Sequence, residues 1–409
     1  MSERSKFFGS TLIISGTALG AGMLALPLVG AASGFILSTT ILLAIWALMI
    51  CTALLILEVN LAFKPYKNNF STMSGALLGP VAKMVTWIIS LGLLYSLAAA
   101  YIAGGASLIS TAFTSILGFV VPEWLCALLF TIVLGGAVFW STKAVDHLNR
   151  GLLSVKGVLL IVTITLLMPH VNVNNLARLH GSVKYVLACA PIFLCSLAFH
   201  HVIPSLSNYV GSKPRTLTWV IICGASLPVA IYILWLIGAL GIVPIIGNKS
   251  FTSLAQQHGS VGEFVQLLIA ITNSKFVGSF INGFTNIAMT TSFLGVTLGL
   301  FDFLADAFKR ANHRVGRLQT ALLTFIPPLI FAFLYPKGFV VALGYAAIFV
   351  AILQIIMPAL MVLRLRSSAN FSSPFRMVGG TPLLVIILLS GVLLVGLQLA
   401  NAFHMLPVL

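Results

Sequence analysis

Long apolar stretches, separated by short charged or proline- and glycine-containing segments, run along the whole 409-residue chain. Each is long enough to cross a membrane as a helix, which takes about 20 predominantly apolar residues. The pattern predicts an all-α integral membrane protein with eleven spans. They cover residues 8–30, 35–63, 80–117, 123–141, 150–169, 184–210, 216–243, 275–308, 318–335, 339–363 and 382–406.

The third and eighth spans are longer than a membrane requires. At 1.5 Å per residue the eighth, 275–308, would measure about 50 Å, so we expect it to be strongly tilted or to extend past the bilayer. The segment 246–272 is the longest stretch outside the spans. Its part after Gly259 is amphipathic and too short to cross, which predicts a helix lying over the extracellular face.

The first span contains three closely spaced glycines, Gly16, Gly20 and Gly22, and Pro27 follows near its end. Each glycine weakens a helix by about 1 kcal/mol relative to alanine. Within lipid, unwound backbone is tolerated only where it is buried in protein or lines a cavity. A helix broken here would offer N–H groups from one half and carbonyls from the other, which suits a zwitterion. Close helix packing is the alternative, since small residues also line ordinary helix contacts.

The sixth span has a second predicted break, where Pro191 and Pro204 bracket the polar centre Ser196 to His201. Proline removes a helix hydrogen bond, and serine and histidine can satisfy the groups that it frees. The two interrupted spans lie five apart, which is typical of transporters built from two five-helix repeats. The repeats would cover about 8–169 and 184–363, with an extra helix at about 382–406, although residue similarity between the halves is weak.

Composition supports a membrane protein, because only 7% of the residues are charged and 59% are hydrophobic, whereas soluble domains carry about 25% charged residues. The net charge of +15 does not indicate a nucleic-acid binder, since the basic residues are scattered between the spans. With the N-terminus inside, 17 of the 22 Lys and Arg residues lie on the inner side and five on the other. This asymmetry predicts a cytoplasmic N-terminus and a periplasmic C-terminus.

The chemistry-bearing residues favour a transporter over an enzyme or a channel. The five cysteines lie in or beside apolar runs without metal-ligand spacing, so we expect neither a metal nor another cofactor. A membrane-embedded enzyme would gather His, Asp or Glu near one face, but the seven acidic residues are scattered. A channel would favour a repeated pore-lining ring over two interrupted helices.

Several segments resemble the bacterial hydroxy/aromatic amino acid permeases. They are GTALGAGMLALPL, IWALM, TALLILEV, FHHVIPS, TSFLGVTLGLFDFLAD, GRLQTALLTFIPPL and YPKGFVVALGYA. The likeness covers nearly the whole chain and is greatest to the tyrosine-specific branch of the family. It implies eleven helices, a five-plus-five inverted repeat of the leucine-transporter type with one extra helix, and proton-driven import across the inner membrane. The family often has a small residue where this chain has His201, so serine, threonine, tryptophan and phenylalanine stay open as alternative substrates.

Backbone groups are the expected ligands of the amino acid, because no Arg, Asp or Glu lies in either broken centre. The N–H groups that begin the outer half of the first span would face the carboxylate, with the positive end of the helix dipole behind them. These belong to Gly20, Ala21 and Gly22. The carbonyls expected to bind the ammonium are those of Thr17, Ala18, Cys195 and Ser196, and the leucine-transporter architecture implied by the resemblance uses the matching positions.

Aromatic residues are candidates for the walls around the substrate's side chain. Phe199, Tyr95 and Tyr101 would serve this role, although aromatic residues are also common in membrane cores. His200 could hydrogen-bond a phenolic hydroxyl, and a pocket built for that group would reject substrates that lack it. The alternative is that His200 and His201 only satisfy the broken backbone.

Lys156 is the main candidate for ion coupling, because it lies about 9 Å inside the cytoplasmic end of the fifth span and ionisable residues at such depth are usually functional. Snorkelling towards the cytoplasm is the alternative. Lys156 resembles the fifth-span lysine of proton-coupled relatives, which stands where sodium-coupled relatives bind an ion between the first and eighth helices. Hydroxyls on the eighth helix complete that ion site, and Thr290 and Thr291 match them. Since a cation at Lys156 would repel sodium, we favour protons, with sodium-coupled or exchange-type transport as the alternative.

Three further acidic residues lie near the cytoplasmic ends of spans. Glu58 could pair with Lys156, carry the proton itself or brace the first helix. Asp302 and Asp306, four residues apart, could pair with Arg4 or Lys6 as an inner gate, or they could be solvated helix ends.

Overall fold

The computed structural model describes residues 3–63, 69–177, 183–256, 259–310, 314–369 and 371–407, apart from the side chains of residues 116, 117, 143 and 183. Every regular element in these ranges is a helix, which confirms the all-α prediction. Ten helical segments in them are long and apolar enough to cross a membrane. Lys64, Lys67 and Arg178, which contribute to the charge asymmetry, lie outside the described residues.

The first predicted span is three pieces rather than one helix: α1 (Glu3–Ala18), η1 (Ala21–Leu24) and α2 (Ala25–Gly30). The short turn η2 (Ala31–Ser33) then leads into α3 (Gly34–Leu61). Gly34 has φ 74°, a left-handed conformation that glycine adopts without steric cost. One apolar segment, Ala21–Leu61, therefore joins the outer part of the first predicted span to the second. This join explains why ten segments are found where eleven spans were predicted.

The remaining helices follow the predicted order. They are α4 (Phe70–Leu78), α5 (Pro80–Leu117), α6 (Glu123–Trp140), α7 (Thr142–Leu167), η3 (Met168–His170), α8 (Val173–Ala177), α9 (Val183–Ser196), η4 (His200–Val202), α10 (Ile203–Val210), α11 (Pro214–Ile242), α12 (Phe251–Gln256), α13 (Val261–Thr272), α14 (Lys275–Ala307), α15 (Arg314–Leu334), α16 (Phe339–Ala351), the π-helix η5 (Ile352–Ile356), α17 (Met357–Ser367) and α18 (Gly380–Ala402).

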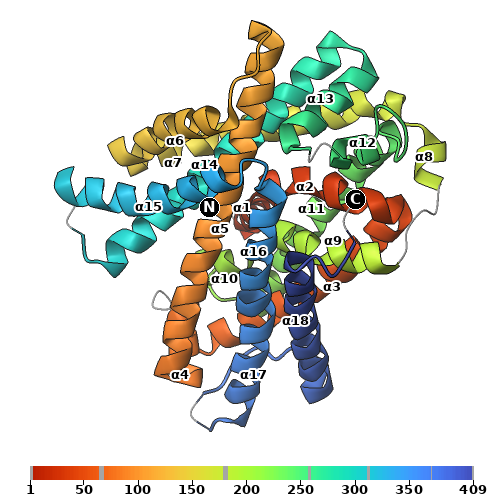
Figure 1. The fold of residues 1–409 in the computed structure, drawn as a ribbon. Helices are drawn as coiled ribbons and strands as arrows, with labels where there is room; N and C mark the ends of the chain where they lie inside the picture. The colour runs from red at the N-terminus through yellow and green to blue at the C-terminus, as the bar shows by residue number, and fades with distance from the viewer. Residues whose placement is uncertain are drawn as a thin grey trace.

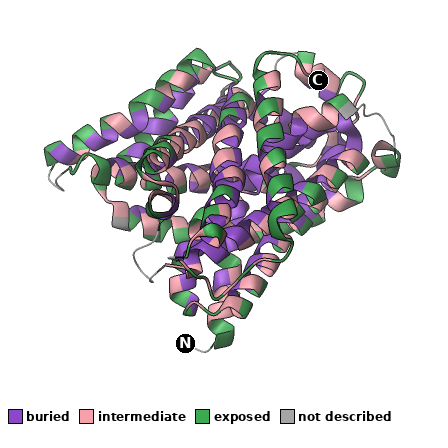
Figure 2. Ribbon diagram, turned by 90° about the horizontal axis from the view of Figure 1, so that it is seen from below, coloured by how far each residue is buried: buried purple, intermediate pink, exposed green. Residues whose placement is uncertain are grey.

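The interrupted helices lie in the middle of the bundle, where the labels of α1, α2, α9 and α10 gather (Figure 1). Around them, α1 packs on α11 and α3 packs on α9, while α5 contacts α14 and α16. Buried residues are concentrated where these helices meet (Figure 2). Large apolar side chains on outward faces, such as Val158 and Ile161 of α7 or Leu389 and Val392 of α18, are exposed. Such faces suit a lipid environment, which offers no polar partners.

The amphipathic segment after Gly259 forms the short helix α13, as predicted. Ser260 caps it, and its hydroxyl and the Glu263 carboxylate make a reciprocal capping box. Gly262 lets α13 approach α5 closely, because a Cβ there would collide with the backbone oxygen of Ser107. Its backbone N–H donates to Ser107 Oγ at 2.7 Å. In Figure 1, α13 lies beside one end of α5 and α4 beside the other.

Candidate functional site

Both predicted helix breaks are present. The first span unwinds at Leu19 and Gly20, where Gly20 is extended with φ −99° and ψ −174°. The sixth unwinds between Ser196, the last residue of α9, and His200, the first of η4. The two breaks touch, because Ser196 Oγ donates to the Gly22 carbonyl at 3.2 Å. A Cβ added to Gly22 would lie 3.1 Å from Ser196 Oγ and 3.5 Å from its Cα, so this contact leaves little room for a side chain.

Helices α14 and α5 reach the first break through hydroxyl groups. The Ala21 N–H donates to Ser292 Oγ of α14 at 2.8 Å. A Cβ at Gly20 would lie 3.4 Å from that oxygen and 3.8 Å from the Tyr101 hydroxyl of α5. Tyr101 therefore lies at the first break, and its role as a wall of the substrate site stays a prediction.

Ser292 is a site residue that the sequence reasoning missed. The predicted Thr291 instead donates to the Ile287 and Ala288 carbonyls of its own helix, at 2.9 and 3.1 Å. One residue along a helix turns the side chain by about 100°, so the choice among Thr290, Thr291 and Ser292 depends on the helix's rotation in the bundle. The only sequence signal was that all three carry hydroxyls.

Lys156 reaches the first break from α7. Its Nζ donates to the Leu19 carbonyl at 2.6 Å, and only 6% of the residue is exposed. Leu19 lies in the unwound segment, one residue beyond the end of α1. The side chain therefore turns into the bundle, and the snorkelling alternative does not describe this conformation.

Tyr232 of α11 contacts both breaks at once and was also missed. Its hydroxyl lies 2.5 Å from the Ala18 carbonyl and 2.9 Å from the Ser196 carbonyl. These are two of the carbonyls predicted to bind an ammonium. Tyr232 is completely buried, and buried tyrosine hydroxyls usually find a partner. Tyr232 lies in an uninterrupted apolar span, and no sequence signal in that span singled it out.

Cys195 and Thr17 are the other two residues whose carbonyls were predicted as ligands. The Cys195 carbonyl accepts from the Ala198 N–H at 3.3 Å, and Cys195 itself is buried. The Thr17 side chain donates its hydroxyl to Ile13 O in its own helix at 2.8 Å, and the role of its carbonyl stays a prediction.

His200 contacts α3 through its side chain and η5 through its backbone. Its Nε2 lies 2.8 Å from Thr52 Oγ1, and its backbone N–H donates to Gln354 Oε1 at 3.4 Å. The Phe199 ring packs against the imidazole at 4.9 Å between centroids. His200 and Phe199 are buried, whereas His201 is exposed. The His200 ring thus already has a hydroxyl partner on α3, and its role as a substrate ligand stays a prediction.

Tyr95 and Glu58 make their contacts away from the two breaks. The Tyr95 hydroxyl donates to Leu323 O of α15 at 2.7 Å, so this residue joins α5 to α15 rather than lining the breaks. Glu58 does not pair with Lys156. Its carboxylate accepts from Arg366 Nε and Nη2 at 2.8 and 2.7 Å and from the Met377 N–H at 2.8 Å.

The predicted inner gate is not formed in this conformation. No ion pair among the described residues joins Arg4 or Lys6 to Asp302 or Asp306. Asp302 instead lines a cavity of about 170 Å³ together with Arg310 and Arg317.

The beginning of α1 contacts α10 and the loop after it. Glu3 forms an ion pair with Lys213, and Lys6 Nζ lies 5.9 Å from the centre of the Tyr209 ring. The hydrogen bond and charge of Lys213 lower the pKa of the Glu3 carboxyl, which lies outside the spans.

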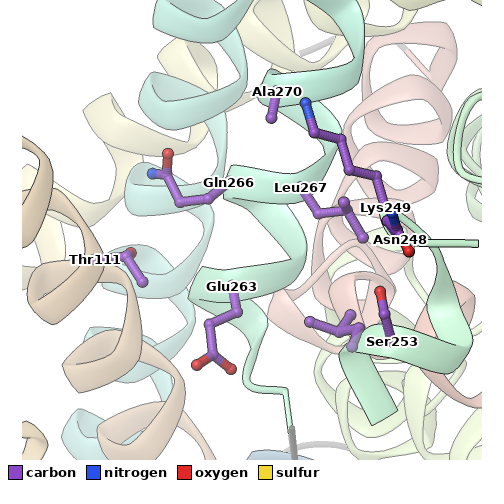
Figure 3. A pocket seen from close by; sticks show the side chains of 9 residues that line it. Thr111, Asn248, Lys249, Ser253, Glu263, Gln266, Leu267 and Ala270 are labelled. Carbon is purple, nitrogen blue, oxygen red and sulfur yellow. The ribbon is translucent and has the colours of Figure 1, made fainter. Parts of the chain in front are cut away.

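A second cavity, of about 300 Å³, lies beside α13 and shares no residue with either break. It is lined by Thr111 of α5, by Asn248 and Lys249 of the loop between α11 and α12, and by residues of α12 and α13. Glu263 and Gln266 project from α13 on the side of Thr111, and Ser253 lies on the other side of α13 with Asn248 and Lys249 (Figure 3).

Comparison with known proteins places this arrangement in context. Residues 3–398 match the model of the tryptophan/tyrosine permease family. The chain is 37% identical over 411 residues to the tryptophan-specific transport protein of Pseudomonas aeruginosa, covering 99% of this chain and 97% of that protein. It is 35% identical over 405 residues to the tyrosine-specific transport system 2 of Haemophilus influenzae, covering 99% of both.

Solved structures share the fold. A crystal structure of the Eremococcus coleocola manganese transporter superposes with a TM-score of 0.64, covering 97% of this chain and 85% of that chain at 14% identity. This likeness supports the fold alone, which is the leucine-transporter type expected above, with its first and sixth spans discontinuous.

Proposed function

The chain belongs to the tryptophan/tyrosine permease family, and from this premise we propose that it imports L-tyrosine by proton symport with alternating access. It is a permease, not an enzyme, of the class that carries aromatic amino acids. As a multi-pass protein of the bacterial inner membrane, it would have its N-terminus in the cytoplasm and its C-terminus in the periplasm, following the distribution of basic residues.

The substrate's two charges would bind between the breaks. The carboxylate would lie at the start of η1, beside the Ala21 N–H and the Ser292 hydroxyl, which are 2.8 Å apart. N–H groups at a helix start favour an anion. The ammonium would take the Ala18 and Ser196 carbonyls, which converge on one hydroxyl and so lie within reach of one small cation.

The observation that carries the coupling proposal is the 2.6 Å contact between Lys156 Nζ and the Leu19 carbonyl. A protonated amine offers three N–H donors, so the proton on Lys156 would stabilise the backbone shape that the substrate needs. Substrate and proton would then each favour the other's binding, because coupling between two sites is reciprocal. The charge of Lys156 at this place would also repel a sodium ion, and sodium symport is therefore the less favoured alternative.

Tryptophan is the second candidate substrate, because a relative named as tryptophan-specific matches as well as one named as tyrosine-specific. His200 was the residue expected to bind the phenolic hydroxyl of tyrosine, but its Nε2 already contacts Thr52. This contact weakens the argument for tyrosine over tryptophan. Both amino acids would bind their backbone atoms to the same cradle, so uptake must be measured for each.

Uptake of labelled tyrosine, tryptophan and leucine into proteoliposomes with an imposed pH or sodium gradient tests this proposal. We expect accumulation of the aromatic substrates that follows the pH gradient, and its loss in Lys156→Ala. Lys249→Ala removes a lysine from an exposed loop and is the matched control, which should accumulate substrate normally. Gradient-driven accumulation in Lys156→Ala equal to wild type would refute the coupling role, and preferred uptake of leucine would refute the substrate class.

A further inference from the structure

One hydroxyl group contacts the last carbonyls of two half-helices. Tyr232 Oη lies 2.5 Å from the carbonyl of Ala18, where α1 ends, and 2.9 Å from that of Ser196, where α9 ends. Each carbonyl is at the negative end of a helix dipole. Tyr232 sits on α11, which is continuous from Pro214 to Ile242 and packs along α1. A residue of an unbroken helix therefore holds the ends of the two broken ones together.

The hydroxyl cannot satisfy both carbonyls fully. A phenol has one proton to donate, while an ammonium has three. The Ala18 carbonyl also accepts from the Gly20 N–H at 2.7 Å. Among the described residues, the Ser196 carbonyl accepts a hydrogen bond from one donor outside α9, and this donor is the Tyr232 hydroxyl. A substrate ammonium placed between the carbonyls would supply the missing donor and compete with Tyr232 for the same lone pairs.

We propose that Tyr232 is a positioning residue that takes the place of the substrate's ammonium at these two carbonyls. When no substrate is bound, its hydroxyl shares one proton between the two carbonyls and keeps the half-helix ends together while the unloaded carrier changes conformation. When substrate is bound, the ammonium takes over this role. This inference rests on the proposed function. It adds the residue that holds the two half-helix ends while the unloaded carrier returns.

The inference predicts a difference between two modes of transport. Net uptake requires the unloaded carrier to return, whereas exchange of internal for external substrate uses only the loaded carrier. Tyr232→Phe removes the hydroxyl and keeps the ring. We expect it to slow net uptake about tenfold, the factor that corresponds to one buried hydrogen bond lost, and to leave exchange within about twofold of wild type. Retained exchange also reports that the variant is folded.

Tyr95→Phe is the matched control, because it also removes a tyrosine hydroxyl that donates to a carbonyl of a neighbouring helix, Leu323 O at 2.7 Å. That bond lies outside the breaks, so net uptake and exchange should stay in their wild-type ratio. Both modes would be measured with labelled tyrosine in the same proteoliposomes, with tryptophan measured in parallel.

The outcomes separate this inference from the proposed function. An equal fall of net uptake and exchange in Tyr232→Phe, or no change in either, would overturn the role of Tyr232 while leaving the transport proposal intact. A wild-type protein that exchanges neither aromatic amino acid would overturn the proposed function, and the role of Tyr232 with it.

Discussion

Glu58 and Arg366 form a two-point ion pair between α3 and α17, with N–O distances of 2.8 and 2.7 Å. Only 2% of the Glu58 side chain and 12% of the Arg366 side chain are exposed. The pair also fixes the connection to α18, because Glu58 accepts from the Met377 N–H and Arg366 donates to the Met377 carbonyl. Glu58 therefore braces the helix bundle and is not available to Lys156.

Glu58→Gln should destabilise the protein, since removing one partner leaves a buried charge uncompensated. We expect a loss of about 3 kcal/mol, measured as a lower thermal midpoint of the purified protein in detergent. Glu263→Gln is the control, because its partner Lys337 lies 3.2 Å away and both side chains are over a third exposed; exposed pairs contribute about 1 kcal/mol or less. Equal shifts in the two variants would contradict the bracing role.

Gly22→Ala is predicted to disturb the contact between the two breaks. The added Cβ would lie 3.1 Å from Ser196 Oγ and 3.5 Å from its Cα, so Ser196 must give way by a few tenths of an ångström, at a cost of about 1–3 kcal/mol typical of overpacking. We expect tyrosine to bind at least about tenfold more weakly, which corresponds to 1.4 kcal/mol.

Gly16→Ala is the internal comparison for that change. It lies in the same span, and its added Cβ would meet no heavy atom within 4 Å. In a helix interior it should leave binding unchanged and stabilise α1 by up to about 1 kcal/mol. Binding of labelled tyrosine to the two purified variants compares their affinities. Unweakened binding in Gly22→Ala would count against the proposed cradle.

Ser292, rather than Thr290 or Thr291, is predicted to be the hydroxyl of α14 that matters for binding. Ser292→Ala removes the hydroxyl that lies 2.8 Å from the Ala21 N–H and that is proposed to lie beside the substrate carboxylate. A hydrogen bond to a charged group contributes about 1.5–3 kcal/mol. Thr291→Val removes only bonds within α14. We expect weaker tyrosine binding in Ser292→Ala and nearly normal binding in Thr291→Val; the reverse order would support the original assignment to an ion site at the threonines.

Thr52 offers a test of whether His200 recognises the phenolic hydroxyl. Thr52→Val keeps the side-chain shape and removes the partner 2.8 Å from His200 Nε2. We expect lower thermal stability, by about 1–3 kcal/mol, and an unchanged ratio of tyrosine to phenylalanine uptake. A changed ratio would show that the imidazole takes part in selecting the substrate.

Much of the architecture could be predicted from the chain alone, because lipid requires every span to be apolar and internally hydrogen-bonded. The glycines of the first span and the prolines of the sixth marked both interrupted helices, and the amphipathic pattern after Gly259 marked α13. The depth of Lys156 singled it out for the same reason, since a charge in an apolar run is rare and needs an explanation.

Only the tertiary structure decided which side chain each break meets. Tyr232, Ser292 and Arg366 lie in otherwise ordinary segments, and what distinguishes them is the rotation and tilt of their helices in the bundle. A change of about 100° in helix rotation moves the contact to the next residue. The sequence could therefore point to the hydroxyls of Thr290 and Thr291 without showing that Ser292 meets the first break, and it left the role of Glu58 open among three alternatives. Hydropathy fixes that a helix crosses the membrane; the packing of its neighbours fixes the direction in which each residue points.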